Sequence, residues 1–284
     1  MTGISALNLS AIFWQSLKLL GSKISTFSCG GGALCGGFIK SGIVQAGQII
    51  LNDVNTERLK SLRDAYQTEF TTETVEAVKD SDIVLLAVKP QQIDQALTGA
   101  KDGFREDQIV ISIAAGVPTE KLHRLIGKDA RIIRVMPNTP ALVGQAMSVV
   151  SRSAYADDEA VEVALRLFSS VGEAVELPED LQNRATAVSG SGPAYFFLMV
   201  EALIDAGVKA GLDESAASTL VIQTMTGSAT MLREIGKKPS ELREMVTSPG
   251  GTTAAALQVF SNHEFRSIVQ EAVEAAIRRA GELA

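Results

Sequence analysis

The stretch "KISTFSCGGGALCGGFIKSG", residues 23–42, decides the fold, because a possible strand runs there into a glycine-rich turn and then a helix. Gly30, Gly32 and Cys35 occupy the three positions of a GxGxxG pattern, with a small cysteine where the third glycine is usual. In dinucleotide-binding folds these positions form a tight turn, admit a pyrophosphate to the backbone and let helix and strand pack closely. A flexible turn that binds nothing remains the alternative. "STFSC" is the weaker part, since a buried parallel strand favours Ile and Val over Ser and Thr.

The next apolar run favours the dinucleotide-binding interpretation of the glycine-rich turn. "QIILND" ends in Asp53, 23 residues after Gly30, near the interval of about 20 at which such folds place an acidic residue on the ribose. Asp53 would accept a hydrogen bond from a 2′-hydroxyl and repel a 2′-phosphate. The polar neighbours that favour the phosphate are Asn52, Asn55, Thr56 and Arg58. The choice between NADH and NADPH therefore stays open.

Apolar runs alternate with helical segments from residue 23 to about residue 177. The runs are "QIILNDV", "DIVLLAVKP", "QIVISIAAG", "RIIRVMPNTP", "MSVV" and "EAVEL". Ile- and Val-rich runs separated by helix-length segments indicate βαβ units and a parallel sheet. The fold class is therefore α/β, with an N-terminal Rossmann-type dinucleotide-binding domain.

Residues 185–284 contain no convincing β-branched run and are predicted to be helical throughout. We place the boundary near residues 178–180, which divides the chain into a leader (1–22), a dinucleotide-binding domain (23–180) and a helical domain (181–284). Residues 194–208 are apolar on nearly all faces, so this helix is buried either within its domain or against a second subunit. Homo-oligomerisation is the corresponding hypothesis.

Composition excludes several classes of protein. The 284 residues carry 26 Lys and Arg against 33 Asp and Glu, a net charge of −7 without a basic run, so nucleic-acid binding is not expected. Two cysteines six positions apart suggest neither a disulfide framework nor a zinc site, which fits a reducing cytoplasm, and we predict no metal. The longest apolar candidate, "AYFFLMV", stops at Glu201, short of the ~18 to 20 residues of a membrane span. The isolated His123 and His263 are expected at the surface.

The run "VTSPGGTTAAAL", residues 246–257, has no charged side chain at what resembles a helix start. Threonine is a good N-cap, so the run fits a plain helix entrance. Its glycines also let the backbone approach a ligand closely. Because helix N-termini bind carboxylates, it equally fits an anion site.

Taken together, residues 23–284 resemble the pyrroline-5-carboxylate reductase family. The segments that carry the resemblance occur in family order and are "LLAVKPQ", "VISIAAGV", "RVMPNTPALVG", "AVSGSGPAYFF", "GVKAGL" and "ELREMVTSPGGTTAAAL". The resemblance implies reduction of 1-pyrroline-5-carboxylate to L-proline by NADPH or NADH, the last step of proline biosynthesis. It also implies a helical domain that forms intertwined homodimers, with larger assemblies such as decamers possible.

The resemblance assigns residues to both ligands. The implied cofactor contacts are Gly30, Gly32, Ala33, Leu34, Asn52, Asp53, Thr74, Val88, Lys89, Pro90, Ala114 and Ala115. The implied substrate contacts are Ser191, Gly192, Ser248, Gly250, Gly251, Thr252 and Thr253, with Asn138 as a further pocket residue. Three features depart from the family: the "STFSC" strand, Thr74 where Asn is usual, and the leader before Lys23. A mis-set start or a local reading-frame error is the plain explanation for both the leader and the strand.

The implied chemistry needs little acid-base machinery. A protonated cyclic imine is already electrophilic, so the protein has to hold it at about 3 to 3.5 Å from the nicotinamide. We hypothesise that the Thr253 hydroxyl orients the ring nitrogen and that Ser191 or a water returns a proton. The rival hypotheses are a related two-domain reductase of another imine or carbonyl, which would need a Lys or His acid, and a non-catalytic NAD(P)-binding sensor.

Overall fold

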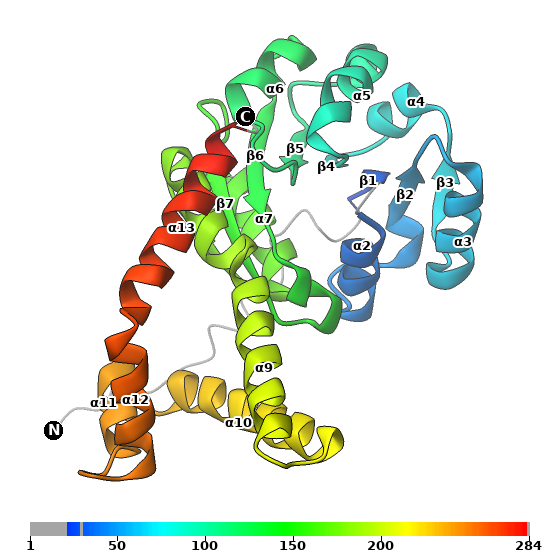
Figure 1. The fold of residues 1–284 in the computed structure, drawn as a ribbon. Coiled ribbons are helices and arrows are strands. Elements are labelled where there is room, and N and C mark those ends of the chain that lie inside the picture. Colours follow the sequence, from blue (N-terminus) through cyan, green and yellow to red (C-terminus); the bar gives the residue numbers. More distant parts are fainter. Residues whose placement is uncertain (1–21, 29–30, 283–284) are drawn as a thin grey trace, which may run out of the picture. The chain divides into compact units, whose positions relative to one another are not determined.

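The protein is described by a computed structural model over residues 22–28 and 31–282 (Figure 1). The predicted leader, apart from Ser22, and the first glycine of the pattern, Gly30, lie outside the described residues. The chain divides into two compact units, one of residues 1–190 with 277–284 and one of residues 191–276. The division thus falls after Gly190, whereas we expected it after residue 180.

The first unit is built on eight strands, which are β1 (Ile24–Ser28), β2 (Ile49–Asn52), β3 (Glu69–Thr71), β4 (Ile83–Ala87), β5 (Ile109–Ser112), β6 (Arg131–Met136), β7 (Ala146–Arg152) and β8 (Gly172–Glu176). They form one sheet in the order β3-β2-β1-β4-β5-β6-β7-β8. Every pair among the first six strands is parallel. The predicted Rossmann-type parallel sheet is therefore confirmed for these strands.

The direction predicted for the last two strands was wrong. β7 pairs antiparallel with β6, and β8 then runs parallel to β7. The connection between β6 and β7 holds only the short turn η5 (Thr139–Val143). A parallel crossover needs about a dozen residues or more, so this short connection turns the chain back along β6.

Helices cover both faces of this sheet (Figure 1). They are α2 (Gly31–Lys40), α3 (Thr56–Tyr66), α4 (Thr74–Lys79), α5 (Ile93–Ala100), α6 (Thr119–Ile126) and α7 (Asp158–Ser169). Successive residues of β4 point to opposite faces: Leu85 joins a core with α2, α3 and α7, while Val84 and Leu86 join a core with α4, α5 and α6. Burial on both faces explains why the central strands are continuously apolar.

β1 occupies the centre of the parallel part despite its polar sequence. It pairs with β2 on one side and β4 on the other. Ile24 and Phe27 enter the two opposite cores, while Ser25 and Thr26 are fully buried between them. The Ser25 hydroxyl has no hydrogen-bond partner among the described residues, which costs stability. Pairing on both sides thus overrides the weak strand propensity of "STFS".

Helix α2 packs closely because its glycines lack side chains. A Cβ on Gly32 would lie 2.7 Å from the Leu62 Cδ2 of α3, and one on Gly36 would lie 2.5 Å from the Tyr66 ring. Cys35, in the place of the third glycine, is buried in the core. Burial raises the pKa of its thiol to about 12. The cysteine therefore serves the packing of helix against strand that we predicted for this position.

The second unit is helical, as predicted. Its helices are α9 (Gly192–Lys209), α10 (Glu214–Glu234), α11 (Pro239–Met245), α12 (Thr252–Asn262) and α13 (Phe265–Glu282), the last of which ends in the first unit. α9 and α10 pack against each other, and Asp213 caps α10 by accepting a hydrogen bond from the Ala216 amide.

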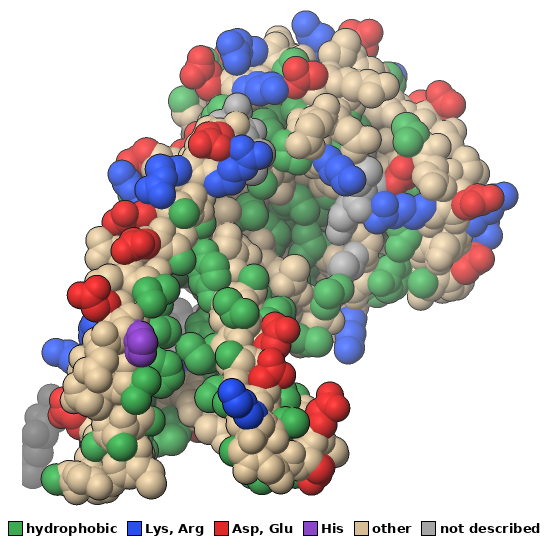
Figure 2. Space-filling model, in the orientation of Figure 1, with side chains coloured by type: hydrophobic (Ala, Val, Ile, Leu, Met, Phe, Trp, Pro, Cys, Tyr) green, Lys and Arg blue, Asp and Glu red, His purple; other side chains and the backbone are tan. Residues whose placement is uncertain are grey.

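Several large apolar side chains of helix α9 are left exposed by the described residues. Phe196, Phe197 and Leu198 are 60%, 64% and 66% exposed, and Figure 2 shows hydrophobic side chains gathered along the helical unit. Large exposed apolar patches mark interaction surfaces in soluble proteins. Of the two predicted environments for this helix, burial within its domain was wrong, and contact with a second subunit remains.

Candidate functional site

The predicted cofactor residues follow the carboxyl ends of neighbouring parallel strands. β1 leads into α2, β2 ends at Asn52, and β4 and β5 lead into the loops that start at Val88 and Ile113. β1 has β2, the next strand in the chain, on one side and β4 on its other side, so the strand order reverses between β1 and β4. This is the topological switch point, where open α/β sheets bind ligands in the crevice beyond the strand ends.

Asp53 offers the clearest fit to a nucleotide ribose. Its carboxylate is nearly buried, at 9% exposure. One oxygen, Oδ1, accepts a hydrogen bond of 2.9 Å from the Asn55 amide, while Oδ2 is buried with no partner among the described residues. A buried carboxylate oxygen without a donor is costly. A ribose hydroxyl is a donor that would satisfy it.

Thr74 reaches the same edge of the sheet by way of Asn52. The Thr74 hydroxyl donates to Asn52 Oδ1 at 3.2 Å, and Asn52 Nδ2 donates to the Thr71 carbonyl at 2.9 Å. Asn52 itself is buried. These bonds connect the end of β2 to β3 and the start of α4. The sequence argument did not find this connection, because a bond between residues 22 positions apart has no local signal.

The remaining predicted cofactor residues differ in exposure. Gly32 and Leu34 are buried at the start of α2, so Leu34 can offer a ligand only its backbone. The other residues lie after β4 and β5 or in α2, and are Ala33, Val88, Lys89, Pro90, Ala114 and Ala115. Lys89 is exposed just before the turn η3 (Pro90–Gln92). The described part of this site is therefore mostly backbone and small side chains, as close approach of a pyrophosphate requires.

The predicted carboxylate-binding run forms a turn and a helix start. Gly250 has a φ of 72°, which favours glycine, and Gly251 is the N-cap of α12 with a φ of −78°. A Cβ on Gly251 would lie 2.3 Å from the Ser248 hydroxyl oxygen. The alternative that Thr253 is the N-cap was wrong, because Thr252 and Thr253 already lie in the first turn. Gly251 lies against the Ser248 hydroxyl in this turn and is the N-cap of α12, two residues before Thr253.

The predicted residues at the start of α9 lie in the same helical unit. Ser191 is the N-cap of α9 but makes no side-chain capping hydrogen bond. Gly192 is buried, and Pro193 follows in the first turn, where its missing N–H costs nothing within the helix. The segment around Thr252 therefore stands at a helix start, where backbone N–H groups lack helical partners, whereas the segment around Ser191 continues from the π-helical turn Thr186–Gly190.

Asn138 lies in the first unit, at the end of β6. Its Nδ2 donates to the Ser189 carbonyl at 3.0 Å, and its Oδ1 accepts from the Met147 amide at 2.8 Å. The side chain is partly buried. Both ends of this amide are therefore engaged by the backbone, and Asn138 as a pocket residue stays a prediction.

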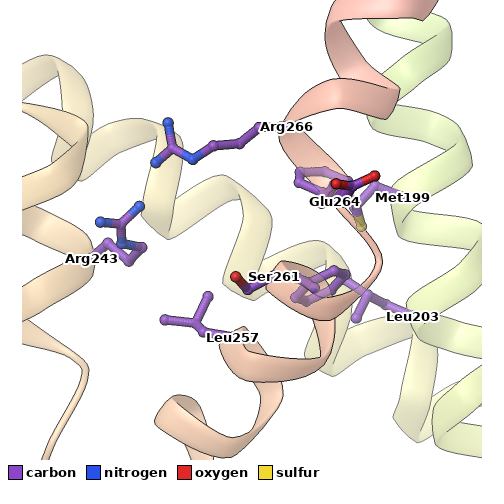
Figure 3. Close-up of a pocket in the computed structure, with 9 residues that line it drawn as sticks. Met199, Leu203, Arg243, Leu257, Ser261, Glu264 and Arg266 are labelled. Carbon is purple, nitrogen blue, oxygen red and sulfur yellow. The ribbon is translucent and has the colours of Figure 1, made fainter.

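A cavity of about 770 Å³ opens within the helical unit. Figure 3 shows charged and apolar side chains around it, which come from α9, α11, α12, α13 and the link between α12 and α13. Its lining residues are Met199, Leu203, Arg243, Leu257, Phe260, Ser261, Glu264, Phe265 and Arg266. The sequence argument named none of these residues as site residues, because apolar residues with scattered charges on successive helices have no distinctive spacing. Conversely, none of the predicted substrate residues lines this cavity.

A doubly wound sheet with a glycine-led helix at its switch point, followed by a helical unit, defines a two-domain dinucleotide-binding enzyme. Residues 29–116 match the family "NADP oxidoreductase coenzyme F420-dependent", and residues 179–283 match "Pyrroline-5-carboxylate reductase dimerisation". With the relatives described next, these matches show that the chain belongs to the pyrroline-5-carboxylate reductase family.

Relatives match along most of the chain. The pyrroline-5-carboxylate reductase of Synechocystis is 42% identical over 83% of this chain and 88% of its own, and that of Arabidopsis thaliana is 41% identical over 86% and 90%. The solved Coxiella burnetii enzyme has a TM-score of 0.87 at 33% identity, with 93% of this chain and 98% of that chain covered. The Plasmodium falciparum enzyme, solved with NADP bound, has a TM-score of 0.84 at 30% identity, with the same coverage.

These matches also bear on the apolar surface of α9. The helical run from Glu179 to Lys209 is long and apolar enough to cross a membrane by length and composition. It lies wholly inside the segment that matches the dimerisation family. A helix that packs against a second copy of the chain buries apolar side chains there, as a core helix does within one chain. Such packing accounts for the apolar composition of the run from Glu179 to Lys209 without a membrane.

Proposed function

We propose that this protein reduces 1-pyrroline-5-carboxylate to L-proline with NADPH or NADH, the last step of proline biosynthesis. The observation that carries the proposal is the start of α12. Its cap is Gly251, which has no side chain, so the first amides of the helix and the two threonines of its first turn are left to a ligand. An uncharged helix N-terminus of this kind suits a small carboxylate.

The cofactor supplies the hydride when it is bound. Its pyrophosphate would lie at the start of α2, where Gly32 brings the backbone close, and its ribose would lie at Asp53, whose Oδ2 lacks a partner among the described residues. That free acceptor suits a ribose hydroxyl. The turns after β4 and β5 would border the nicotinamide half.

The groups proposed to act on the substrate bind its carboxylate, orient its ring and supply a proton. The Gly251 amide already donates to the Ser248 carbonyl at 3.0 Å, so the amides of Thr252 and Thr253 hold the carboxylate. The Thr253 hydroxyl accepts a hydrogen bond from the protonated ring nitrogen and so sets the face of the ring. As the C=N bond becomes C–N, the nitrogen gains an electron pair, and the Ser191 hydroxyl or a neighbouring water gives it a proton. Ser191 is suited to this task because its side chain does not cap α9.

The helical unit supports self-association. We infer a homodimer or a higher homo-oligomer in the cytoplasm, in which a second copy covers α9 and fills the apolar cavity. Arg243, Arg266 and Glu264 at the cavity edge then select complementary charges. A partner of this sequence would satisfy both the apolar lining and the exposed phenylalanines of α9.

The proposed function is tested by following NADPH and NADH oxidation with 1-pyrroline-5-carboxylate. Thr253→Ala should lower kcat/KM about 10- to 100-fold, the range for losing a hydrogen bond to a charged group. Thr253→Ser keeps the hydroxyl and should stay near wild type. A Thr253→Ala enzyme with wild-type kinetics would remove the role of this residue, whereas a wild-type protein that oxidises neither cofactor with this substrate would overturn the function.

A further inference from the structure

The carbonyl of Ser189 has no helical donor because of a proline. In an α-helix this carbonyl would accept from the N–H four residues later, but that residue is Pro193, which has no N–H. The next amide, that of Ala194, is already bonded to the Ser191 carbonyl at 3.0 Å. The chain here forms the π-helical turn η7 (Thr186–Gly190) just before α9.

The side chain of Asn138 supplies the missing donor. Its Nδ2 lies 3.0 Å from the Ser189 carbonyl, while its Oδ1 holds the Met147 amide of β7 at 2.8 Å. One side chain therefore ties the turn after β6, the start of β7 and the last part of η7 together. Asn138, Met147 and Ser189 all belong to the first unit.

The rest of η7 is held by bonds of its own. Thr186 Oγ1 donates to the Gln182 carbonyl at 2.7 Å, and Ser189 Oγ donates to the Ala185 carbonyl at 3.0 Å. Gln182 is buried and donates to the Val149 carbonyl of β7 at 3.1 Å. The turn is thus anchored near its first residue by Gln182 and near its last by Asn138.

We propose that Asn138 is a positioning residue that fixes the backbone of Ser189 and Gly190, directly before the substrate residue Ser191 in the chain. The chain continues from the anchored Ser189 through Gly190 directly into Ser191 and Gly192, so the Asn138 amide holds the backbone two positions before Ser191. π-helical turns are rare and occur frequently at functional sites. This inference rests on the proposed function, in which Ser191 and Gly192 face the substrate.

The test separates the two ends of the Asn138 side chain. Asn138→Asp keeps the acceptor for Met147 but puts a second oxygen opposite the Ser189 carbonyl. It should raise KM for 1-pyrroline-5-carboxylate about tenfold, with a smaller change in kcat and an unchanged dissociation constant for NADPH. Asn138→Ala should show the same split. An Asn138→Asp enzyme with wild-type KM would overturn the proposal.

Pro193→Ala provides a rescue that a merely structural role of Asn138 does not predict. It restores an N–H that can donate to the Ser189 carbonyl. The double variant Asn138→Ala with Pro193→Ala should therefore recover KM to within about threefold of Pro193→Ala alone, so the two effects should not be additive. Additive losses in KM would contradict the pairing of these two residues.

A readout independent of activity distinguishes this inference from the proposed function. In Asn138→Asp, hydrogen exchange of the backbone amides in residues 186–195 should be faster than in the wild type, while exchange in β4 and β5 stays the same. If the wild type fails to reduce 1-pyrroline-5-carboxylate, the proposed function is wrong. Hydrogen exchange in residues 186–195 still shows whether Asn138 anchors the Ser189 carbonyl. Unchanged exchange in residues 186–195 would overturn the anchoring itself.

Discussion

Gly32→Ala tests how the glycine-led helix serves the cofactor. A Cβ at this position would lie 2.7 Å from Leu62 Cδ2 and 3.2 Å from Leu62 Cδ1. Carbon atoms prefer a separation of about 3.5–4.0 Å. The added methyl group is therefore roughly 1 Å too close to α3, so either Leu62 rotates or the start of α2 moves.

The free energy of unfolding should change little, because two effects offset each other. Overpacking costs about 1–3 kcal/mol, and the lower end applies here since the clash is with the tip of a partly buried leucine. Replacing a glycine by alanine within a helix contributes about 0.5–1 kcal/mol of stability. Cofactor affinity should suffer more, because a displacement of about 1 Å at a binding group costs up to a hundredfold. We expect the dissociation constant of NADPH to rise at least about tenfold.

The assay is NADPH binding by fluorescence titration of Gly32→Ala, Leu62→Ala and the double variant. If the methyl group acts by pushing against α3, the double variant should bind NADPH nearly as well as Leu62→Ala alone. Gly99→Ala is the matched control, since it lies in α5 with nothing within 4 Å of its Cβ, and it should bind NADPH normally. A double variant that binds as weakly as Gly32→Ala would refute this reasoning and show that the methyl group obstructs the cofactor directly.

Two further predictions concern the first unit. Gly172 has a φ of 154° and a Cβ there would lie 2.1 Å from a carbonyl oxygen of β7, so Gly172→Ala should lower the free energy of unfolding by about 2–5 kcal/mol in urea denaturation; a loss below about 1 kcal/mol would contradict the geometry. Burial raises the pKa of Cys35 to about 12, so in a Cys29→Ser background iodoacetamide should label the folded protein slowly at about pH 8 and the urea-unfolded protein quickly. Because the folded pKa of Cys35 lies above the unfolded value of about 8.5, its contribution to stability is full below that pH and is lost as the pH rises toward 12. Equal labelling of the folded and the urea-unfolded protein would refute the raised pKa of the buried Cys35 thiol.

The central strands and several helix starts followed from local sequence. "IVLLA" and "IVIS" are buried on both faces and became β4 and β5. Asn55 and Asp213 accept hydrogen bonds from the Arg58 and Ala216 amides and so cap α3 and α10, as these residue types favour before a helical run. By contrast, β3 escaped prediction, because three residues with one large apolar side chain have no readable period.

Tertiary contacts decided where the first unit ends. A change in composition near residue 180 predicted the boundary, but Glu179 accepts hydrogen bonds from the Thr119 amide and hydroxyl, and Gln182 is buried against β7. These partners lie at least 33 positions away in the chain. Hydrogen bonds over such separations leave no periodic trace, so composition does not show that residues 179–190 pack with the first unit.

The sequence by itself indicated the chemistry proposed for this protein. Glycine turns, uncharged helix starts and an acidic strand end depend on residue type and on short spacings, and both can be read directly from the sequence. Only the tertiary structure decided that Asp53 Oδ2 has no partner among the described residues, that Asn138 donates to the Ser189 carbonyl where Pro193 cannot, and that apolar side chains of α9 are exposed. Each of these depends on which distant groups meet and which are left without a partner. Hydrogen bonding and burial are properties of the folded neighbourhood rather than of the residue.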